Sequence, residues 1–538
     1  MSTTDTPSNI TTTLEPILSE RFALKWHDFA ICSWFACFFM YMSYLPLFHS
    51  DIWGHVMYGK WILEHGVLPQ QDPFMSLAAG MRLVDNAWAS QVFLAWIHDI
   101  GGAQAISTCF AVVVLLVYVI QFRVFYLMSG SKWIALAGTM TSFGLVITRH
   151  AVIRPEIFGA LLFSLLLWIL VHFEPWRRRS VVLREQPSWR RPPLWVWIAI
   201  PIMFAVWANV HGSFAVGLVV LGCHGLGRAC DVLYRSRSIR VLLRDVRFRQ
   251  WILLTELALL ATLVNPYGID LLIQTATFGK NPNLREILEW YPLTLVDLEG
   301  IQFSIAALAV LFLWRHSRQR VRPVDIAMLG LFAFTVATTV RMLSWFAPIF
   351  AFTMIPHLTA ICSRWKRSRQ PAAAEDPSSV TANKFAFTML TLLVIWCAFA
   401  FSPASQPLLS DKPVRDEQLY SQYTPLKISQ YLRENPPKGL VYAPQWWGDW
   451  MIWDGPEHPQ VMVTTNIHLV PRQVWRNYMQ VQIAAEGWER ILDHYGIRTL
   501  IVHKEMQRKL ARVVRKSGKW NIAFETDLGI VLKRNKSL

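Results

Sequence analysis

A carboxylate and an imidazole stand one helical turn apart near the start of the chain. In the stretch His49-Ser50-Asp51-Ile52-Trp53-Gly54-His55, Asp51 and His55 would share one face of a helix. A partly desolvated carboxylate beside a titratable ring can accept a proton from a hydroxyl group or hold a divalent cation. Asp72, just before Pro73, adds a second carboxylate. The alternatives are local roles, with Asp51 or Ser50 capping a helix and Asp72 beginning a turn.

Arginine residues between apolar stretches supply the complementary chemistry. Arg149 and Arg154 stand beside His150 and Glu156, and Arg341 stands in another short junction. Guanidinium groups that face lipid are costly, so we expect these side chains to point into a wet cavity or to bind an anion. A phosphate or pyrophosphate would suit their bidentate geometry. Snorkelling of the arginines to lipid headgroups is the alternative.

Further polar residues stand where apolar residues would suffice. The junctions between apolar stretches contain Asn209, His211, Asn265 and Tyr267. One such residue alone is more often a satisfied structural group. Their convergence on one side of the membrane predicts a substrate cavity, to which we add Trp88 as a lining residue. Lys60 joins the candidates for binding an anion, and a later loop carries Glu286, Glu289 and Trp290.

The elements that must position these residues are membrane spans. The chain has 538 residues, of which 53% are apolar and 16% are charged, and it contains 26 tryptophans. This composition is too apolar for an ordinary soluble enzyme of this length. Apolar stretches of about the length needed to cross a bilayer recur along the chain. We predict about eleven spans, at 29–48, 103–121, 133–148, 155–173, 194–210, 212–227, 250–266, 301–315, 323–340, 343–362 and 384–402.

The distribution of basic residues predicts the orientation of the spans. The chain carries 52 Lys and Arg against 36 Asp and Glu, a net charge of +16. With the N-terminus inside, the inner loops hold 23 basic residues and the outer loops hold 7. This asymmetry is typical of cytoplasmic loops that face anionic lipid. We do not expect nucleic-acid binding, because no binding motif surrounds the basic runs.

The expected organisation has three parts. Residues 1–28 form a cytoplasmic tail, 29–402 form the transmembrane domain with a first outer loop at 49–102, and 403–538 form a small soluble α/β domain. Within the loop, Asp51–Glu64 and Trp88–Ile100 read as amphipathic helices on the membrane surface. The C-terminal part alternates predicted strands at 439–443, 461–465, 499–502, 521–525 and 529–532 with helices.

Cysteine usage and the N-terminus exclude several classes of protein. The seven cysteines all fall within or beside apolar stretches, so neither a disulfide framework nor a zinc-binding spacing is present. The first 28 residues are polar and mixed in charge, without the pattern of a cleavable signal peptide. We therefore expect the first apolar stretch to remain as a membrane anchor.

Taken together, these motifs resemble a known family. The pattern Asp51-Ile-Trp-Gly-His55, Gly59 to Gly66, Asp72-Pro73-Phe74, Trp88, Arg149 to Pro155, Asn209-Val-His-Gly212 and Asn265-Pro-Tyr-Gly268 resembles the multi-spanning GT-C glycosyltransferases. Within them it looks most like the bacterial branch related to protein mannosyltransferases and aminoarabinose lipid A transferases. The C-terminal Trp446-Trp447-Gly448-Asp449-Trp450 is similar to the soluble tail of uncharacterised members.

The resemblance implies an activity and a location. It implies transfer of a sugar from a polyprenyl-phosphate donor to a glycan, lipid or protein acceptor on the outer face of a bacterial inner membrane. Asp51 matches the family's base, assisted by His55 or Asp72, while Arg149, Arg154 and Arg341 would stabilise the departing lipid phosphate. The C-terminal domain would be periplasmic, and its sequence has no nucleotide-binding glycine loop.

Metal dependence and two other functions stay open. Family members often have adjacent paired acidic residues here, whereas Ser50 precedes Asp51 in this chain. A divalent cation such as Mg²⁺ or Mn²⁺, held by Asp51, His55 and Asp72, is therefore possible without being required. A transporter or flippase of lipid-linked sugars would use the same arginines without a base. A non-catalytic scaffold subunit would use the polar residues only to support its structure.

Overall fold

The three-dimensional structure of the protein is a computed structural model. It describes residues 24–174, 193–369, 380–410, 414–456 and 460–535. Most of the expected cytoplasmic tail 1–28 and of the arginine-rich loop 174–193 lies outside the described residues.

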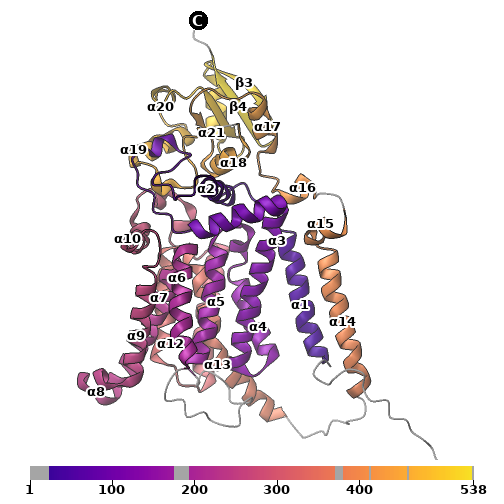
Figure 1. Cartoon of the computed structure of the whole chain (residues 1–538), viewed down its shortest axis with the longest axis vertical. Helices are drawn as coiled ribbons and strands as arrows, with labels where there is room; N and C mark the ends of the chain where they lie inside the picture. The colour runs from indigo at the N-terminus through magenta and orange to yellow at the C-terminus, as the bar shows by residue number, and fades with distance from the viewer. Residues whose placement is uncertain (1–23, 175–192, 370–379, 411–413, 457–459, 536–538) are drawn as a thin grey trace, which may run out of the picture.

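A bundle of long helices forms the lower body of the molecule (Figure 1). Each of the eleven predicted apolar stretches falls on one of its helices. The bundle comprises α1 (Trp26–Ser43), α3 (Trp88–Ser129), α4 (Lys132–Gly144), α5 (Glu156–Phe173), α6 (Leu194–Val210), α7 (Phe214–Ser236), α9 (Val246–Ala261), α11 (Leu298–Ser317), α12 (Pro323–Thr338), α13 (Leu343–Arg369) and α14 (Val380–Ala400). Its core is apolar, with fully buried side chains such as Phe163, Trp207 and Phe214.

The bundle identifies a membrane protein. Among the described residues, five helices are long and apolar enough to cross a membrane, and a bent pair at 386–409 would make a sixth. The helices α6 and α12 are apolar but have only 17 and 16 residues. A full crossing takes roughly 20 residues. The figure of eleven spans therefore stays a prediction.

Two helices lie across one end of the bundle (Figure 1). The first is α2 (Ile52–His65), and the second is the initial part of α3. The backbone of α3 breaks at Gly101 and Gly102, and Gly102 has φ 62° and ψ −159°, a conformation open essentially only to glycine. At this break the chain changes direction, from the predicted surface helix Trp88–Ile100 to the span that follows it.

The apolar side of α2 does not face lipid, contrary to the sequence-based expectation. Its residues Ile52, Trp53 and Val56 are buried against protein. The ring of Trp53 stacks on Trp453 at 5.1 Å and meets Trp450 edge-on at 5.2 Å. The periodicity predicted the buried face of the helix correctly. It could not predict that the C-terminal part of the chain, rather than lipid, covers that face.

The C-terminal part contains a four-stranded sheet. Its strands are β1 (Val441–Tyr442), β2 (Thr499–His503), β3 (Trp520–Glu525) and β4 (Gly529–Arg534), in the order β1-β2-β4-β3. β1 and β2 are parallel, and the other pairs are antiparallel. Residues 461–465, predicted as a strand, contribute only a single bridge between Val441 and Val461.

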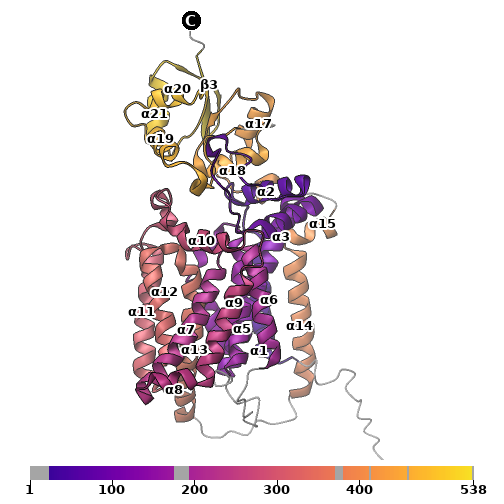
Figure 2. The same ribbon diagram turned by 60° about the vertical axis from the view of Figure 1, so that its left-hand side comes forward.

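Short helices surround this sheet and connect the other elements. The C-terminal ones are α15 (Gln406–Leu409), α16 (Asp416–Leu419), α17 (Leu426–Glu434), α18 (Gln445–Asp454), α19 (Arg472–Gln482), α20 (Trp488–His494) and α21 (Arg508–Lys516). At the opposite end of the bundle lies α8 (Ile239–Arg244), while α10 (Ile269–Thr277) lies at the same end as α2 (Figure 2).

The C-terminal domain is fixed to two segments at the end of the bundle. The backbone of Leu47 exchanges hydrogen bonds with Leu419 and Ser421. The side chain of Asn283, in the segment between α10 and α11, donates to the carbonyl groups of Ile467 and Val470. Together with the contacts of Trp53 with Trp450 and Trp453, these bonds attach the domain to the start of the 49–102 loop and to the 278–297 segment. Residues of both segments also line the cavity described next.

Candidate functional site

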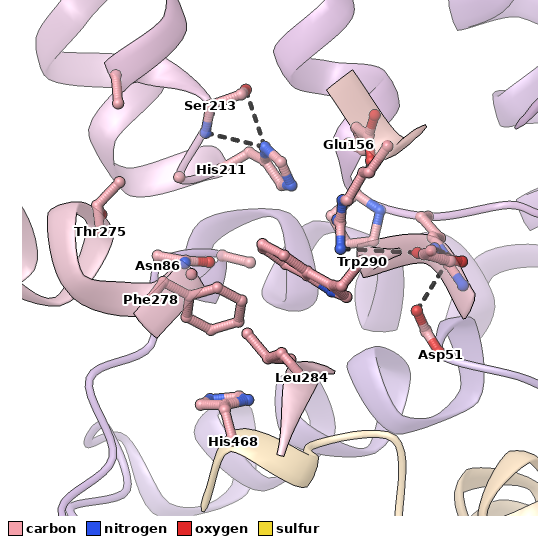
Figure 3. A pocket seen from close by; sticks show the side chains of 18 of the residues that line it. Asp51, Asn86, Glu156, His211, Ser213, Thr275, Phe278, Leu284, Trp290 and His468 are labelled. Atoms are coloured by element: carbon pink, nitrogen blue, oxygen red, sulfur yellow. Dashed lines mark hydrogen bonds and ion pairs between the residues drawn. The ribbon is translucent and has the colours of Figure 1, made fainter. Parts of the chain in front are cut away.

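A cavity of about 910 Å³ lies where α2, the 278–297 segment and the C-terminal domain meet the end of the bundle (Figure 3). Three kinds of wall surround it. Apolar and hydroxyl side chains of α7 and α12 form one, ionisable groups form a second, and the C-terminal domain adds a third. Residues that represent these walls are Val216, Val219, Leu331, Phe332 and Thr335, then Asp51, His55, Arg154, Glu156, His211, Glu289 and Arg341, and finally Trp446, Asn466 and His468.

Asp51 lies at the start of α2 but does not cap it. Its side chain makes no capping hydrogen bond, so the local role considered from sequence is absent. Instead its Oδ2 atom lies 2.8 Å from Nε of Arg154. A dashed line at Asp51 in Figure 3 marks an ion pair of this carboxylate. Two candidates that are far apart in the sequence therefore meet as an ion pair at the cavity wall.

The carboxylate of Glu289 contacts all three arginines that were predicted to bind an anion. Its carboxylate lies 2.6 Å from Nη1 of Arg154, 3.5 Å from Nη2 of Arg149 and 3.8 Å from Nη1 of Arg341. Arg341 also reaches Oε2 of Glu156 at 3.2 Å. Burial alone would raise the pKa of Glu289, but the charges of the arginines outweigh it and hold that pKa at about 2. The arginines are thus already neutralised by carboxylates of the same chain.

His55 lies beside a buried polar pair that the sequence analysis did not single out. Nδ1 of His55 is 3.2 Å from Nε2 of Gln91, and the same amide nitrogen donates to Oδ1 of Asp85 at 3.2 Å. The backbone N–H of Ala87 also donates to Oδ1, at 2.9 Å. Burial lowers the pKa of His55 to about 4, although the charge of Asp51 raises it. The ring is therefore neutral near pH 7.

His211 is the second imidazole at the cavity. Its Nδ1 atom accepts from the backbone N–H of Ser213 at 3.1 Å and lies 2.8 Å from the Ser213 hydroxyl. Since Nδ1 accepts the backbone hydrogen bond, the proton of the neutral ring is on Nε2. Burial lowers the pKa of His211 to about 4, against the charge of Glu156. His211 can thus donate one hydrogen bond to a ligand.

Asp72 has the local role that its sequence context allowed. Its Oδ1 atom accepts from the backbone N–H groups of Phe74 and Met75 at 2.8 and 3.0 Å, which is the turn expected before Pro73. Its Oδ2 atom accepts from the hydroxyl of Tyr58 at 2.6 Å. The aspartate does not line the cavity, so the assisting role beside Asp51 is not supported.

The residues proposed as metal ligands are not brought together. Oδ2 of Asp51 already contacts a guanidinium, Nδ1 of His55 meets Gln91, and both oxygens of Asp72 accept hydrogen bonds. Within the ranges that the structure covers, no three His, Cys, Asp or Glu side chains are placed to hold a metal ion. These residues do not fit a Mg²⁺ or Mn²⁺ site.

Three other predicted cavity residues hold loops together instead. The indole of Trp88 donates to Oδ1 of Asn209 at 2.9 Å, and the Asn209 amide donates to the carbonyl groups of Ala205 and Val264. Asn265 bonds within its own turn, accepting from the backbone of Tyr267 and donating to that of Thr262 and Gly268. None of Trp88, Asn209, Asn265 and Tyr267 lines the cavity.

Lys60 lies away from the arginines. Its ammonium group is 3.6 Å from Asp99 and 4.7 Å from the centre of the Trp453 ring. It therefore belongs to the contact between α2, α3 and α18, and not to an anion site at the cavity. Arg149, which also does not line the main cavity, borders a smaller one of about 100 Å³ inside the bundle.

The fold of this bundle and its C-terminal domain is similar to that of a solved membrane oligosaccharyltransferase, a glycosyltransferase of the GT-C kind that the sequence motifs resemble. The chain is similar to the Archaeoglobus fulgidus oligosaccharyltransferase tethered with an acceptor peptide, with a TM-score of 0.53 and 12% identity over 96% of this chain and 75% of that one. The apo form gives 0.51 and 12%, over 91% and 71%. ArnT from Cupriavidus metallidurans bound to undecaprenyl phosphate gives 0.49 and 12%, over 94% and 97%. No protein-family model and no curated protein sequence matches the chain.

Proposed function

We propose that this protein is a glycosyltransferase that moves a sugar from a polyprenyl-phosphate-linked donor to an acceptor bound at the cavity. One observation carries the proposal. A single cavity joins an apolar wall on α7 and α12 to a cluster of arginines and carboxylates. Val219 and Leu331 in that wall are 39% and 41% exposed, so the wall reaches the outside of the bundle, where lipid would lie. An isoprenoid chain fits the apolar wall, and its phosphate fits Arg154 and Arg341.

The reaction we propose is a single displacement at the anomeric carbon. Asp51 accepts the proton of the acceptor hydroxyl as the new bond from oxygen to carbon forms. The bond from the anomeric carbon to the phosphate oxygen breaks, and Arg154 and Arg341 stabilise the charge on the leaving phosphate. Because attack and departure occur on opposite sides of one carbon, the configuration inverts. Neutral His55 and His211 can each donate a hydrogen bond to the bound sugar or phosphate.

The arginines must change partners when the donor binds. A sugar phosphodiester carries one negative charge, the same as the carboxylate of Glu289, which contacts Arg154 at 2.6 Å. Replacing one by the other keeps the charge of the site balanced. Arg154 also contacts Asp51, so exchange of Glu289 for phosphate leaves the base held by the same guanidinium.

The charge distribution supports a proposal for the cellular location. The segment 228–249 carries seven basic residues, and its helix α8 lies at the end of the bundle opposite the C-terminal domain (Figure 1). With basic segments inside, the cavity and the C-terminal domain face the outer side. The site would then be periplasmic in a bacterial inner membrane, and the acceptor would be a glycan, a lipid or a protein.

Lipid identification tests the proposal without a guess about the sugar. We would purify the full chain gently and identify its bound lipids by native mass spectrometry, for wild type, Asp51→Asn and Arg154→Ala. We expect a polyprenyl phosphate or its glycosylated form on the wild type, its loss in Arg154→Ala, and enrichment of the sugar-loaded form in Asp51→Asn. Asp99→Asn, which alters an aspartate paired with Lys60 outside the cavity, serves as the matched control.

Two results would contradict the proposal. Ordinary phospholipid alone on every variant would remove the argument for a lipid-linked donor and favour a scaffold. A flippase would be favoured if wild type bound a polyprenyl-linked sugar and transported it across a membrane without transferring the sugar to an acceptor. Asp51→Asn would then transport the lipid as well as wild type does.

A further inference from the structure

Two buried hydrogen-bond acceptors at the cavity have no donor. They are Oδ2 of Asp85 and Oε1 of Gln91, and within the described residues neither atom has a hydrogen-bond partner. The two side chains belong to residues that are only 7% and 4% exposed, and both residues line the cavity of about 910 Å³. Buried polar atoms are nearly always paired, because an unpaired one loses its water without compensation.

The surrounding hydrogen bonds fix which atoms remain free. Oδ1 of Asp85 accepts from the backbone N–H of Ala87 at 2.9 Å and from the amide of Gln91 at 3.2 Å. A carboxylate oxygen accepts hydrogen bonds, so the nitrogen of the Gln91 amide must face it. That nitrogen also meets Nδ1 of His55 at 3.2 Å. Both donors of the amide are thereby committed, and its oxygen, like Oδ2 of Asp85, is left for a ligand.

The chemistry of the missing ligand follows from the two free acceptors. They require a molecule that brings hydrogen-bond donors, and they repel an anion. A phosphate therefore belongs at the arginines and not here. Adjacent hydroxyl groups on a sugar ring supply two donors at neighbouring positions, and a site built to bond a hydroxyl discriminates strongly against ligands that lack it.

The position of the pair relates it to the proposed reaction. Gln91 contacts His55, which lies one helical turn after Asp51 on α2. The acceptor pair is thus linked through His55 to the helix that begins at the proposed base, and it lines the same cavity as Asp51 and Arg154. A sugar joined to a phosphate at Arg154 would have its ring between the arginine and this pair.

We infer that Asp85 and Gln91 form the subsite that recognises the sugar of the lipid-linked donor, by accepting hydrogen bonds from two of its hydroxyl groups. This inference rests on the proposed function. It adds two specificity-determining residues that hold the sugar and take no part in proton transfer.

The test compares a sugar-loaded lipid with the bare lipid. The full-length protein, in nanodiscs, is mixed with undecaprenyl phosphate and with undecaprenyl phosphate bearing glucose, mannose, galactose or 4-amino-4-deoxyarabinose, and bound species are counted by native mass spectrometry. We expect wild type to prefer one hexose-loaded lipid over the bare lipid. Asp85→Asn and Gln91→Met should reduce that preference about tenfold and leave binding of the bare lipid unchanged.

Gln121→Met is the matched control. Gln121 lies on the same helix, is also 4% exposed and also has an unpaired Oε1 atom, but it borders the cavity of about 100 Å³. Its replacement should leave the preference intact.

Each other result overturns the inference in a recognisable way. If Asp85→Asn and Gln91→Met keep the preference for the sugar-loaded lipid, these residues do not form the donor-sugar subsite, and the proposed function is unaffected. The same conclusion holds if the variants keep this preference but lose transfer to an acceptor. If the two variants lose binding of the bare lipid and of the sugar-loaded lipid equally, Asp85 and Gln91 have only a structural role. A preference of wild type for the amino sugar alone, lost in Asp85→Asn, replaces hydroxyl recognition by recognition of an ammonium group. Failure of wild type to bind any polyprenyl lipid overturns the proposed function and the subsite together.

Discussion

Nε of Arg154 lies 2.8 Å from Oδ2 of Asp51, and the same guanidinium reaches Glu289 through Nη1 at 2.6 Å. One side chain therefore joins the start of α2 to the segment between α10 and α11. The proposed base and the proposed phosphate site are not independent, because both depend on where this guanidinium lies. Mutations at Arg154 should consequently affect stability as well as chemistry.

Replacing Arg154 by alanine should destabilise the protein. Two carboxylates, on Asp51 and Glu289, would lose their shared cation while their side chains stay 23% and 25% exposed. We expect the free energy of unfolding to fall by about 2–4 kcal/mol. This loss is smaller than that for breaking a fully buried ion pair, because the two carboxylates are partly exposed. Thermal unfolding in detergent measures the change. Adding Glu289→Gln should restore part of the loss, and simple additivity of the two substitutions would show that the charges are not coupled.

Glu289→Gln alone should strengthen binding of polyprenyl phosphate. The substitution removes the carboxylate that contacts Arg149, Arg154 and Arg341, so the phosphate no longer competes with it. We expect the affinity to rise by about tenfold, which corresponds to one charged hydrogen bond. Competition between undecaprenyl phosphate and bulk phospholipid, read by native mass spectrometry, measures this.

Glu286→Gln is the control for that experiment. Glu286 lies in the same segment, but it bonds to Arg472 and Trp475 of the C-terminal domain and does not line the cavity. Its replacement should leave lipid affinity unchanged. Equal effects of both substitutions would mean that the whole segment has moved and that Glu289 does not compete with the lipid directly.

The sequence predicted the parts of this site that follow from hydrophobic patterning. Apolar stretches located the helices, and polar or charged residues at their ends are unusual enough to mark Asp51, Arg154, Arg341 and His211 as neighbours of one cavity. Such reasoning places a residue along the membrane normal. It does not say which side of a helix end the residue faces, and for that reason Lys60 was assigned to the wrong surroundings.

Two further groups of residues needed the three-dimensional structure. Asn209 and Asn265 donate hydrogen bonds to neighbouring backbone carbonyl groups. In the sequence, an asparagine with this structural role looks the same as one that lines a cavity, because each places an amide between two spans. Asp85 and Gln91 look like a helix-start aspartate and an ordinary helical glutamine. Only the packing of α2 on α3 buries them beside His55, and no local pattern reports that packing.

The stability of the protein should depend on pH through Asp449. Burial raises the pKa of Asp449 to about 8, the charge of Asp51 raises it further, and hydrogen bonds from Thr465 lower it. An unfolded aspartate titrates near 3.8. A folded pKa above the unfolded one means that this stabilising contribution is complete below about pH 4 and is lost as the pH rises to about 8. The wild type should therefore lose stability across that interval.

Asp449→Asn isolates this contribution. Near pH 4 the variant should unfold at the same temperature as wild type or at a slightly lower one, and at pH 9 it should unfold several degrees above wild type. Measuring both proteins at several pH values cancels the titration of other groups. In the background of Asp51→Asn the advantage of Asp449→Asn at pH 9 should be smaller, because a charge that raises the folded pKa of Asp449 is gone and the loss of stability ends at a lower pH. A temperature difference that does not vary with pH would contradict the assignment.

Gly59 tests whether the contact between α2 and α3 sets the geometry of the cavity. A Cβ atom at this position would lie 2.0 Å from the carbonyl oxygen of Gln91 and 2.5 Å from its carbonyl carbon. The obstacle is backbone, so Gly59→Ala must push α2 away from α3 and separate His55 from Gln91. We expect a loss of about 1–3 kcal/mol in stability and a loss of sugar preference, although Gly59 does not line the cavity.

Gly222→Ala on α7 makes the same chemical change where nothing lies within 4 Å of the added atom. Helix propensity alone then applies, so this variant should be as stable as wild type or more stable by up to about 1 kcal/mol. Thermal unfolding compares the two alanine variants directly, and the lipid competition compares their sugar preference. If Gly59→Ala matched Gly222→Ala in both measurements, the close approach of α2 to α3 would not control the position of His55, and the recognition of the sugar would have to depend on other contacts.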